Sequence, residues 1–248
     1  MELIFLILSA FITSSISAVV GMGGGIILLG IMAFIIPQGF LVIALHGIIQ
    51  LISNSTRTYV FRKHLKKTLL KQFALGAFCG LLLACLLIIL FINAFKVNSA
   101  NEINIEFLKP IIGLFIIWYL YIKKTKQVKR NKTFYKVGII SGLSTVFIGA
   151  TGPLIAPFFL QDNFSKKNIV ANKAACQAIS HIGKIPIFIY FFNINYFTQL
   201  YILIPLVIVV FLGTYIGKSI LSYVPEKIFK MIFKISLTAI AINLILSF

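Results

Sequence analysis

The chain has 248 residues, of which 60% are hydrophobic and only 11% are charged, and its formal net charge is +18. Roughly a quarter of the residues of a soluble domain are charged, so this composition excludes an ordinary soluble fold. The positive charge would otherwise suggest nucleic-acid binding. Here the Lys and Arg clusters lie between apolar runs, so we expect no nucleic-acid partner and expect the clusters to contact anionic membrane lipids.

Long apolar runs follow one another along the whole chain. A run of about 20 apolar residues is long enough to cross a bilayer as a helix. We therefore predict an all-α polytopic membrane bundle of about eight transmembrane segments, with interruptions in the first and fifth. The segments are 3–36, 40–61, 72–92, 107–122, 134–160, 169–192, 199–217 and 228–247. The three cysteines lie singly in apolar segments, and we predict no metal or cofactor.

Basic residues cluster in the second and fourth connectors, 62–71 and 123–136, whereas the connectors 93–106 and 161–168 are rich in Asn. The bias of Lys and Arg towards the cytoplasm places the two basic connectors inside and the two Asn-rich connectors outside. With eight segments, this predicts a multi-pass protein of the cell membrane with both termini in the cytoplasm. Lys218 and Lys227 fit less well, because they fall in a connector that this arrangement places outside.

The two interruptions are rich in glycine and resemble each other. The first contains Gly21, Gly23, Gly24 and Gly25, and the second contains Gly149, Thr151 and Gly152, followed by Pro153. A shift of 128 residues aligns Gly21 with Gly149 and Gly24 with Gly152. We infer an internal duplication, with a first repeat at 1–122, a basic cytoplasmic connector at 123–136 and a second repeat at 137–248.

The glycine-rich breaks have a chemical consequence. Adjacent glycines, or glycine followed by proline, lower helix stability, so the helix is expected to unwind there. Unwound backbone inside a membrane is tolerated where it lines a cavity, and its freed amides at a helix start can bind an anion. Paired broken helices indicate the substrate site of a transporter. The alternative is that the glycines only allow close helix packing.

The segments that follow the breaks carry matching polar stripes at helical spacing. The first stripe is Gln50, Ser53, Asn54 and Arg57, and the second is Gln177, Ser180, His181 and Lys184. We predict that both face the bundle interior and bind the substrate, with interhelical hydrogen bonding as the alternative. Lys184 lies deep in its segment and should determine affinity, whereas Arg57 lies near a segment end and should act as a funnel or as a membrane-surface anchor. A shift of 127 residues aligns the two stripes, and it also aligns His46 with Lys173, which are weaker candidates.

The acidic residues support an anionic substrate. All five lie in connectors or at chain ends: Glu2, Glu102, Glu106, Asp162 and Glu226. The membrane interior therefore has a net positive site, which favours a small anion over a cation. An inside-negative potential favours export of an anion without a coupling ion, whereas import would need one. The coupling ion could be a proton carried by His46 or His181, or a sodium ion at a site built from carbonyl oxygens.

The glycine elements and the eight-segment duplicated plan resemble the TauE/SafE sulfite exporter family, also called the toluene sulfonate uptake permeases. The resemblance rests on Gly21, Gly23, Gly24 and Gly25 in the first half and on Gly149, Gly152, Pro153 and Pro157 in the second. It implies transport of sulfite, thiosulfate or an organosulfonate. The chain departs from the family pattern with Gly30, where a proline is common, and with His46, where a small or hydroxyl residue is usual.

An intramembrane serine hydrolase of the rhomboid type is the alternative function. Ser144 and His181 could form its catalytic dyad, although serines in membrane helices mostly bond to backbone carbonyls. A transporter is favoured, and we predict no catalytic residue and no enzyme. The sequence is compatible with a homo-oligomer and contains no signal that specifies one.

Overall fold

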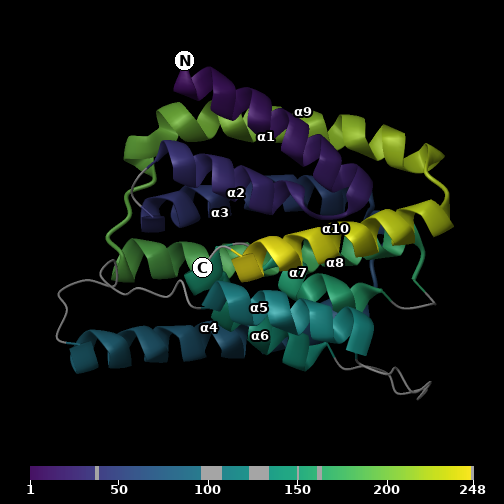
Figure 1. Cartoon of the computed structure of the whole chain (residues 1–248). Coiled ribbons are helices and arrows are strands. Elements are labelled where there is room, and N and C mark those ends of the chain that lie inside the picture. The colour runs from purple at the N-terminus through teal and green to yellow at the C-terminus, as the bar shows by residue number, and fades with distance from the viewer. Residues whose placement is uncertain (37–38, 96–107, 123–133, 150, 161–163, 247–248) are drawn as a thin grey trace.

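The computed structural model describes residues 1–36, 39–95, 108–122, 134–149, 151–160 and 164–246. Within these ranges every regular element is a helix (Figure 1). The longer helices are α1 (Glu2–Val20), α2 (Gly24–Ile35), α3 (Gly39–Val60), α4 (Lys67–Phe95), α5 (Leu108–Ile117), α6 (Tyr135–Ile148), α8 (Lys166–Phe191), α9 (Leu200–Tyr223) and α10 (Glu226–Leu246). The short ones are η1 (Arg62–His64), η3 (Trp118–Ile122), α7 (Gly152–Ile155), η4 (Ala156–Phe159) and η5 (Phe197–Gln199).

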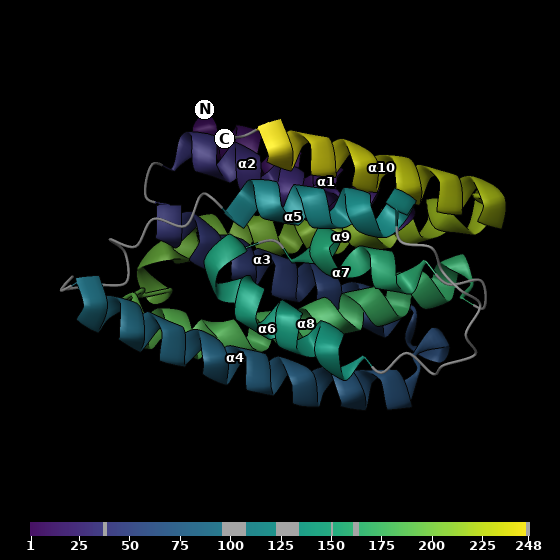
Figure 2. The ribbon, with the colours of Figure 1, turned by 60° about the horizontal axis from the view of Figure 1, so that its bottom comes forward.

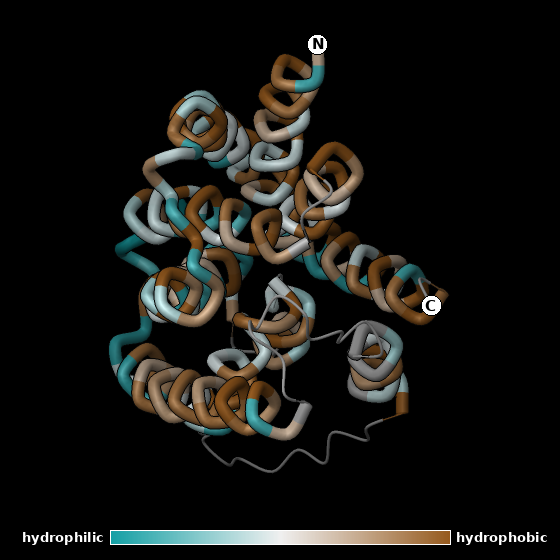
Figure 3. The backbone as a smooth tube through the Cα atoms, turned by 90° about the vertical axis from the view of Figure 1, so that its left-hand side faces the viewer, coloured by the Kyte–Doolittle hydropathy of each residue, from teal (hydrophilic) through white to brown (hydrophobic). Residues whose placement is uncertain are grey.

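The outer surface of the bundle is apolar. Four helices are long and apolar enough to cross a membrane: α1, α4, α9 with the turn before it, and α10. Large hydrophobic side chains are exposed at helical spacing along them, as in Ile4, Leu8, Ile12 and Ile16 of α1. Figure 3, which looks along the helices from the end with both termini, shows that hydrophobic residues dominate them. The predicted all-α membrane protein with several transmembrane passes is confirmed.

The first glycine break is the tip of a helical hairpin. α1 ends at Gly21, whose φ of 81° lets the chain reverse, and Gly23 also has a positive φ. α2 then packs back along α1 so closely that a Cβ on Gly24 would lie 1.8 Å from the carbonyl oxygen of Thr13. We expected one interrupted helix to cross the membrane here. The structure corrects this, because left-handed glycines turn the chain back instead of only unwinding it.

The second break forms a similar hairpin. α6 ends at Gly149, which has a φ of 77°. α7 and η4 then return towards the start of α6, so that the ring centroids of Phe159 and Phe134 lie 5.2 Å apart. The fifth expected segment is therefore also a hairpin, with a longer first arm and a short second one.

The two hairpins change which connectors share an end of the bundle. Asn168 donates to the carbonyl oxygen of His64 at 2.9 Å, and the backbone N–H of Lys166 donates to Glu226 at 2.7 Å. The connectors after α3, before α8 and before α10 thus lie together, which we call the basic end, and both termini point to the opposite end (Figures 1 and 2). From the sequence we expected the connector 161–168 to lie on the opposite side of the membrane from 62–71, and both termini to lie on the same side as 62–71. Each hairpin adds one reversal of the chain direction, which changes both relationships.

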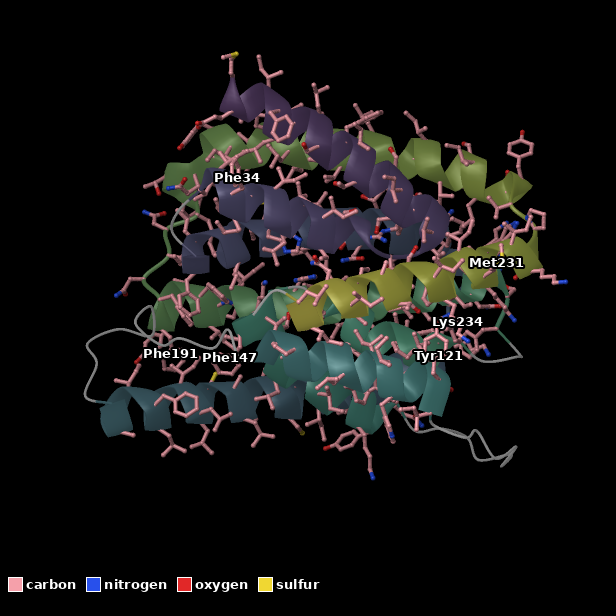
Figure 4. The ribbon with its side chains drawn as sticks, in the orientation of Figure 1. Phe34, Tyr121, Phe147, Phe191, Met231 and Lys234 are labelled. Atoms are coloured by element: carbon pink, nitrogen blue, oxygen red, sulfur yellow. The ribbon has the colours of Figure 1, made fainter. Side chains whose placement is uncertain are left out.

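A lysine and a tyrosine pair near the basic end. Figure 4 shows Lys234 of α10 beside Tyr121 of η3, with the ammonium 4.4 Å from the ring centroid. Phe34, Phe147 and Phe191 lie towards the other end in the same view. Of the connector 123–136, only residues 134–136 belong to the described part of the chain.

The helix pairs place α3 and α8 at the centre of the molecule. α1 packs against α9, α4 against α6, α3 against α8, and α5 against α10. Glycines bring two of these pairs into backbone contact. A Cβ on Gly142 would lie 2.2 Å from the carbonyl oxygen of Ala77, and one on Gly217 would lie 2.5 Å from that of Ser15. The polar stripes of α3 and α8 are consequently held inside the bundle, against the hairpin tips.

Candidate functional site

A small cavity lies where the two hairpin tips meet α3 and α8. It is lined by Ser17, Met22, Gly23, Gly25 and Ile26 of the first hairpin, His46, Gln50 and Arg57 of α3, Gly152 and Pro153 of the second hairpin, and Lys173, Gln177 and His181 of α8. Seven of these residues were predicted as site residues from the sequence: Gly23, Gly25, Gln50, Arg57, Gly152, Gln177 and His181. The structure therefore brings together residues that lie more than a hundred positions apart in the chain.

Arg57 is a buried wall of the cavity. Its side chain is only 2% exposed, and one terminal nitrogen donates to Ser17 Oγ at 2.8 Å and to the Ser17 carbonyl oxygen at 3.2 Å. The other donates to Asn54 Oδ1 at 2.7 Å. Because these bonds hold the guanidinium inside the bundle, Arg57 does not extend to the headgroups in this structure.

Lys173 supplies the second cation. Its ammonium, on a side chain that is 2% exposed, donates to the carbonyl oxygen of Gly21 at 3.0 Å and to Gln177 Oε1 at 3.0 Å. An ammonium has three donors, so one remains after these two bonds. Both partners are neutral, and a buried positive charge held by neutral dipoles favours an anion beside it.

Two glutamines lie against tip glycines in equivalent positions. A Cβ on Gly25 would lie 3.0 Å from Gln50 Oε1, and a Cβ on Gly152 would lie 2.8 Å from Gln177 Nε2. Each glycine therefore makes room for an amide of the opposing helix. Glycine is needed here for close approach, and the amides can donate to a ligand between the tips.

Two histidines complete the polar wall. His46 Nε2 lies 2.7 Å from the carbonyl oxygen of Gly25, and the ring of His181 lies edge-on to that of His46, with 6.5 Å between centroids. Both side chains are 1% exposed.

The other predicted site residues surround the cavity without lining it. Ser53 contacts Thr214 Oγ1 at 3.3 Å, and Ser180 contacts Ser141 Oγ at 2.9 Å, so these serines join helices. Lys184 is fully buried, and its ammonium donates to the carbonyl oxygen of Ile43 at 3.1 Å. Of the remaining four, Gly21 and Asn54 accept hydrogen bonds from Lys173 and Arg57, Gly24 packs against α1, and Gly149 ends α6 with a positive φ.

Thr151, at the second tip, is the last of the predicted residues. It is buried, and its hydroxyl has no hydrogen-bond partner among the residues that the structure describes. It does not line the cavity, but it immediately precedes Gly152, which does.

Sequence reasoning did not predict several of the lining residues as site residues. Ser17, one turn before the first break, accepts from Arg57, and its only signal was its position beside the glycines. Met22, Ile26 and Pro153 also belong to the tips or follow them. Lys173 was ranked below Lys184, because depth along a segment does not reveal which lysine faces a hairpin tip.

The arrangement suits an anion. Arg57 and Lys173 contribute positive charge, and the acids in the described ranges, Glu2 and Glu226, are both exposed and lie away from the cavity. The hydrolase alternative gains no geometric support, since Ser144 is not among the lining residues and no described contact joins it to His181.

Comparison with known proteins identifies the family of the chain. The family model described as sulfite exporter TauE/SafE matches residues 6–244 of the chain. No curated protein and no solved structure matches it. Because the matched region covers nearly the whole chain, the protein belongs to the TauE/SafE sulfite exporter family of membrane transporters.

Proposed function

We propose that this protein is a secondary transporter or facilitator that binds a small sulfur-containing oxyanion, such as sulfite or thiosulfate, between its two hairpin tips. The observation that carries the proposal is the pair of buried cations, Arg57 and Lys173, in one cavity with the tip glycines. The start of α2, the positive end of its dipole, contributes Gly25 and Ile26 to the lining of the same cavity. A transporter needs such a site near the middle of the membrane.

The size of the cavity favours a small anion. The space inside it that the centre of a water-sized molecule can reach is only about 20 Å³, little more than the roughly 10 to 15 Å³ that one bound water needs. An arylsulfonate would need more room and an apolar wall. The polar lining suits an oxyanion that accepts hydrogen bonds on every side.

The distribution of basic residues supports one orientation in the cell membrane. Exposed cations gather at the basic end: Arg62, Lys63, Lys67, Lys71, Lys136 and Lys227. The bias of Lys and Arg towards the cytoplasm places this end inside and both termini outside. Lys218 and Lys227, which did not fit the eight-segment arrangement, lie on the inner side in this orientation.

The helix pairs support an inverted repeat. If the helices α1 to α5 correspond in order to the helices α6 to α10, the pair α1–α9 corresponds to the pair α6–α4. The pairs α3–α8 and α5–α10 then each correspond to themselves. The first hairpin begins at the end with the termini and the second begins at the basic end (Figure 1). We propose a first repeat of α1 to α5 and a second of α6 to α10, related by an axis in the membrane plane.

Anion binding to the purified protein tests the proposal. A ligand that binds the folded state at 100 times its Kd should stabilise it by about 2.7 kcal/mol. We expect sulfite or thiosulfate to raise the unfolding temperature in detergent, and choline, a cation, to leave it unchanged. Equal effects of all salts, or no effect of any sulfur oxyanion, would contradict the proposed site.

A further inference from the structure

The two cavity histidines come from different halves of the chain and face each other. His46 belongs to α3 and His181 to α8, and their rings are arranged edge to face with 6.5 Å between centroids. Both rings are almost completely buried, and both line the cavity. They therefore share the space that an anion would enter.

Hydrogen bonding leaves each ring able to accept a proton. The carbonyl oxygen of Gly25, 2.7 Å from His46 Nε2, can only accept, so this nitrogen carries a hydrogen and Nδ1 is the basic atom. His181 Nδ1 is buried and has no hydrogen-bond partner among the described residues. An unpartnered buried nitrogen is uncommon and calls for a function.

The charges around the pair are all positive. Lys184 interacts electrostatically with both rings, and Arg57 interacts with His181. Lys173 of α8 lines the same cavity. From the hairpins and α9, the described residues nearest the site are uncharged, namely Ser17, Met22, Ile26, Gly152, Pro153 and Thr214. A proton on either ring would thus meet repulsion in the empty site.

We propose that the His46–His181 pair binds a proton together with the transported anion, so that the protein is an anion–proton symporter. The inference rests on the proposed anion site. An anion in the cavity offsets the repulsion from the three cations, so anion binding favours protonation of the pair. Linkage is reciprocal, and protonation must favour anion binding by the same factor. One bound proton lowers the charge of the load by one, from −2 to −1 for thiosulfate, so import of the pair opposes an inside-negative potential less than import of the anion alone.

The test uses proteoliposomes with thiosulfate, which stays fully ionised between about pH 5.5 and 8, where imidazoles titrate. An inward thiosulfate gradient should acidify the lumen, as reported by a trapped pH-sensitive dye. Thiosulfate affinity should rise by about tenfold per pH unit of acidification where one proton is taken up per anion. His46→Gln and His181→Gln keep a neutral polar side chain and should bind thiosulfate with a flattened pH dependence.

The matched control is His64→Gln, the third histidine, which lies in η1 outside the cavity and contributes its backbone carbonyl to Asn168 and Asn172. It should retain the parental pH dependence and proton flux. Thiosulfate flux without acidification in the parent protein would overturn symport and leave the proposed function intact. Absence of thiosulfate binding at every pH would overturn the proposed function itself. Unchanged pH dependence in both cavity variants would show that the proton binds elsewhere.

Discussion

The ammonium of Lys173, in α8, donates to the carbonyl oxygen of Gly21 at the tip of the first hairpin, 3.0 Å away. This bond joins the second half of the chain to the break of the first half. The carbonyl is one that the end of α1 leaves available, because the chain reverses there. An anion that attracts Lys173 would compete with this contact, so binding and the position of the tip are physically connected.

Removal of the Lys173 charge should weaken anion binding. A charge-assisted hydrogen bond contributes roughly 1.5 to 3 kcal/mol, so Lys173→Gln should raise the Kd for thiosulfate about ten- to a hundredfold. Lys234→Gln is the control, because Lys234 lies over Tyr121 and outside the cavity. Isothermal titration of the purified proteins measures both. Equal affinities of Lys173→Gln and the parent would remove Lys173 from the site.

Arg57 should matter for binding as well as for flux. Its guanidinium lines the cavity and is fixed by Ser17 and Asn54. Arg57→Gln is expected to weaken thiosulfate binding by at least about tenfold, since a charged donor is lost. Lys184→Gln should weaken it less, because the Lys184 ammonium bonds to the Ile43 carbonyl away from the lining. A larger loss of affinity in Lys184→Gln than in Arg57→Gln would contradict this placement, because it would show that Lys184 rather than Arg57 is the main contact of the anion.

The α4–α6 contact should be intolerant of side chains. A Cβ on Gly142 would lie 2.2 Å from the carbonyl oxygen of Ala77, and backbone cannot move as cheaply as a side-chain end. Gly142→Leu should destabilise the protein by at least about 1 to 3 kcal/mol. Thermal unfolding in detergent measures the loss. Gly30→Leu is the control, since no atom lies within 4 Å of a Cβ there, and comparable stability of the two variants would show that the helices are less closely packed.

Single cysteines should report the orientation. In a chain without its native cysteines, Asn195→Cys lies exposed at the end with the termini, and Lys63→Cys lies exposed at the basic end. An impermeant maleimide applied to intact cells should label the first and should label the second only after permeabilisation. The opposite pattern would place the basic end outside and contradict the proposed orientation.

The sequence predicted the membrane class and much of the polar centre for clear reasons. Lipid-facing helices require long apolar runs, and buried charge in such runs is costly enough to stand out, as at Arg57 and Lys184. The resemblance of the two glycine breaks also indicated where the chain departs from straight helices. Seven of the predicted site residues do line one cavity.

What the sequence did not predict depends on the backbone path. Gly21 and Gly149 adopt positive φ and reverse the chain, and a glycine run alone does not distinguish reversal from unwinding. These two reversals changed which connectors share an end of the bundle. They also brought the tip of the first hairpin to Lys173. Gly24 serves close packing against Thr13, whereas its neighbour Gly25 faces Gln50, a difference that one residue of helical rotation decides.

Thiosulfate flux through Gly25→Leu and Gly30→Leu proteoliposomes tests the central claim, that the anion passes between the hairpin tips. Both substitutions lie in α2 and add the same side chain. A Cβ at Gly25 would lie 3.0 Å from the flexible end of Gln50, and a leucine there would extend from a residue that lines the cavity, whereas Gly30 faces open space. The account predicts that Gly25→Leu folds and loses saturable thiosulfate uptake while Gly30→Leu transports at the parental rate. Parental uptake by a folded Gly25→Leu protein would contradict it.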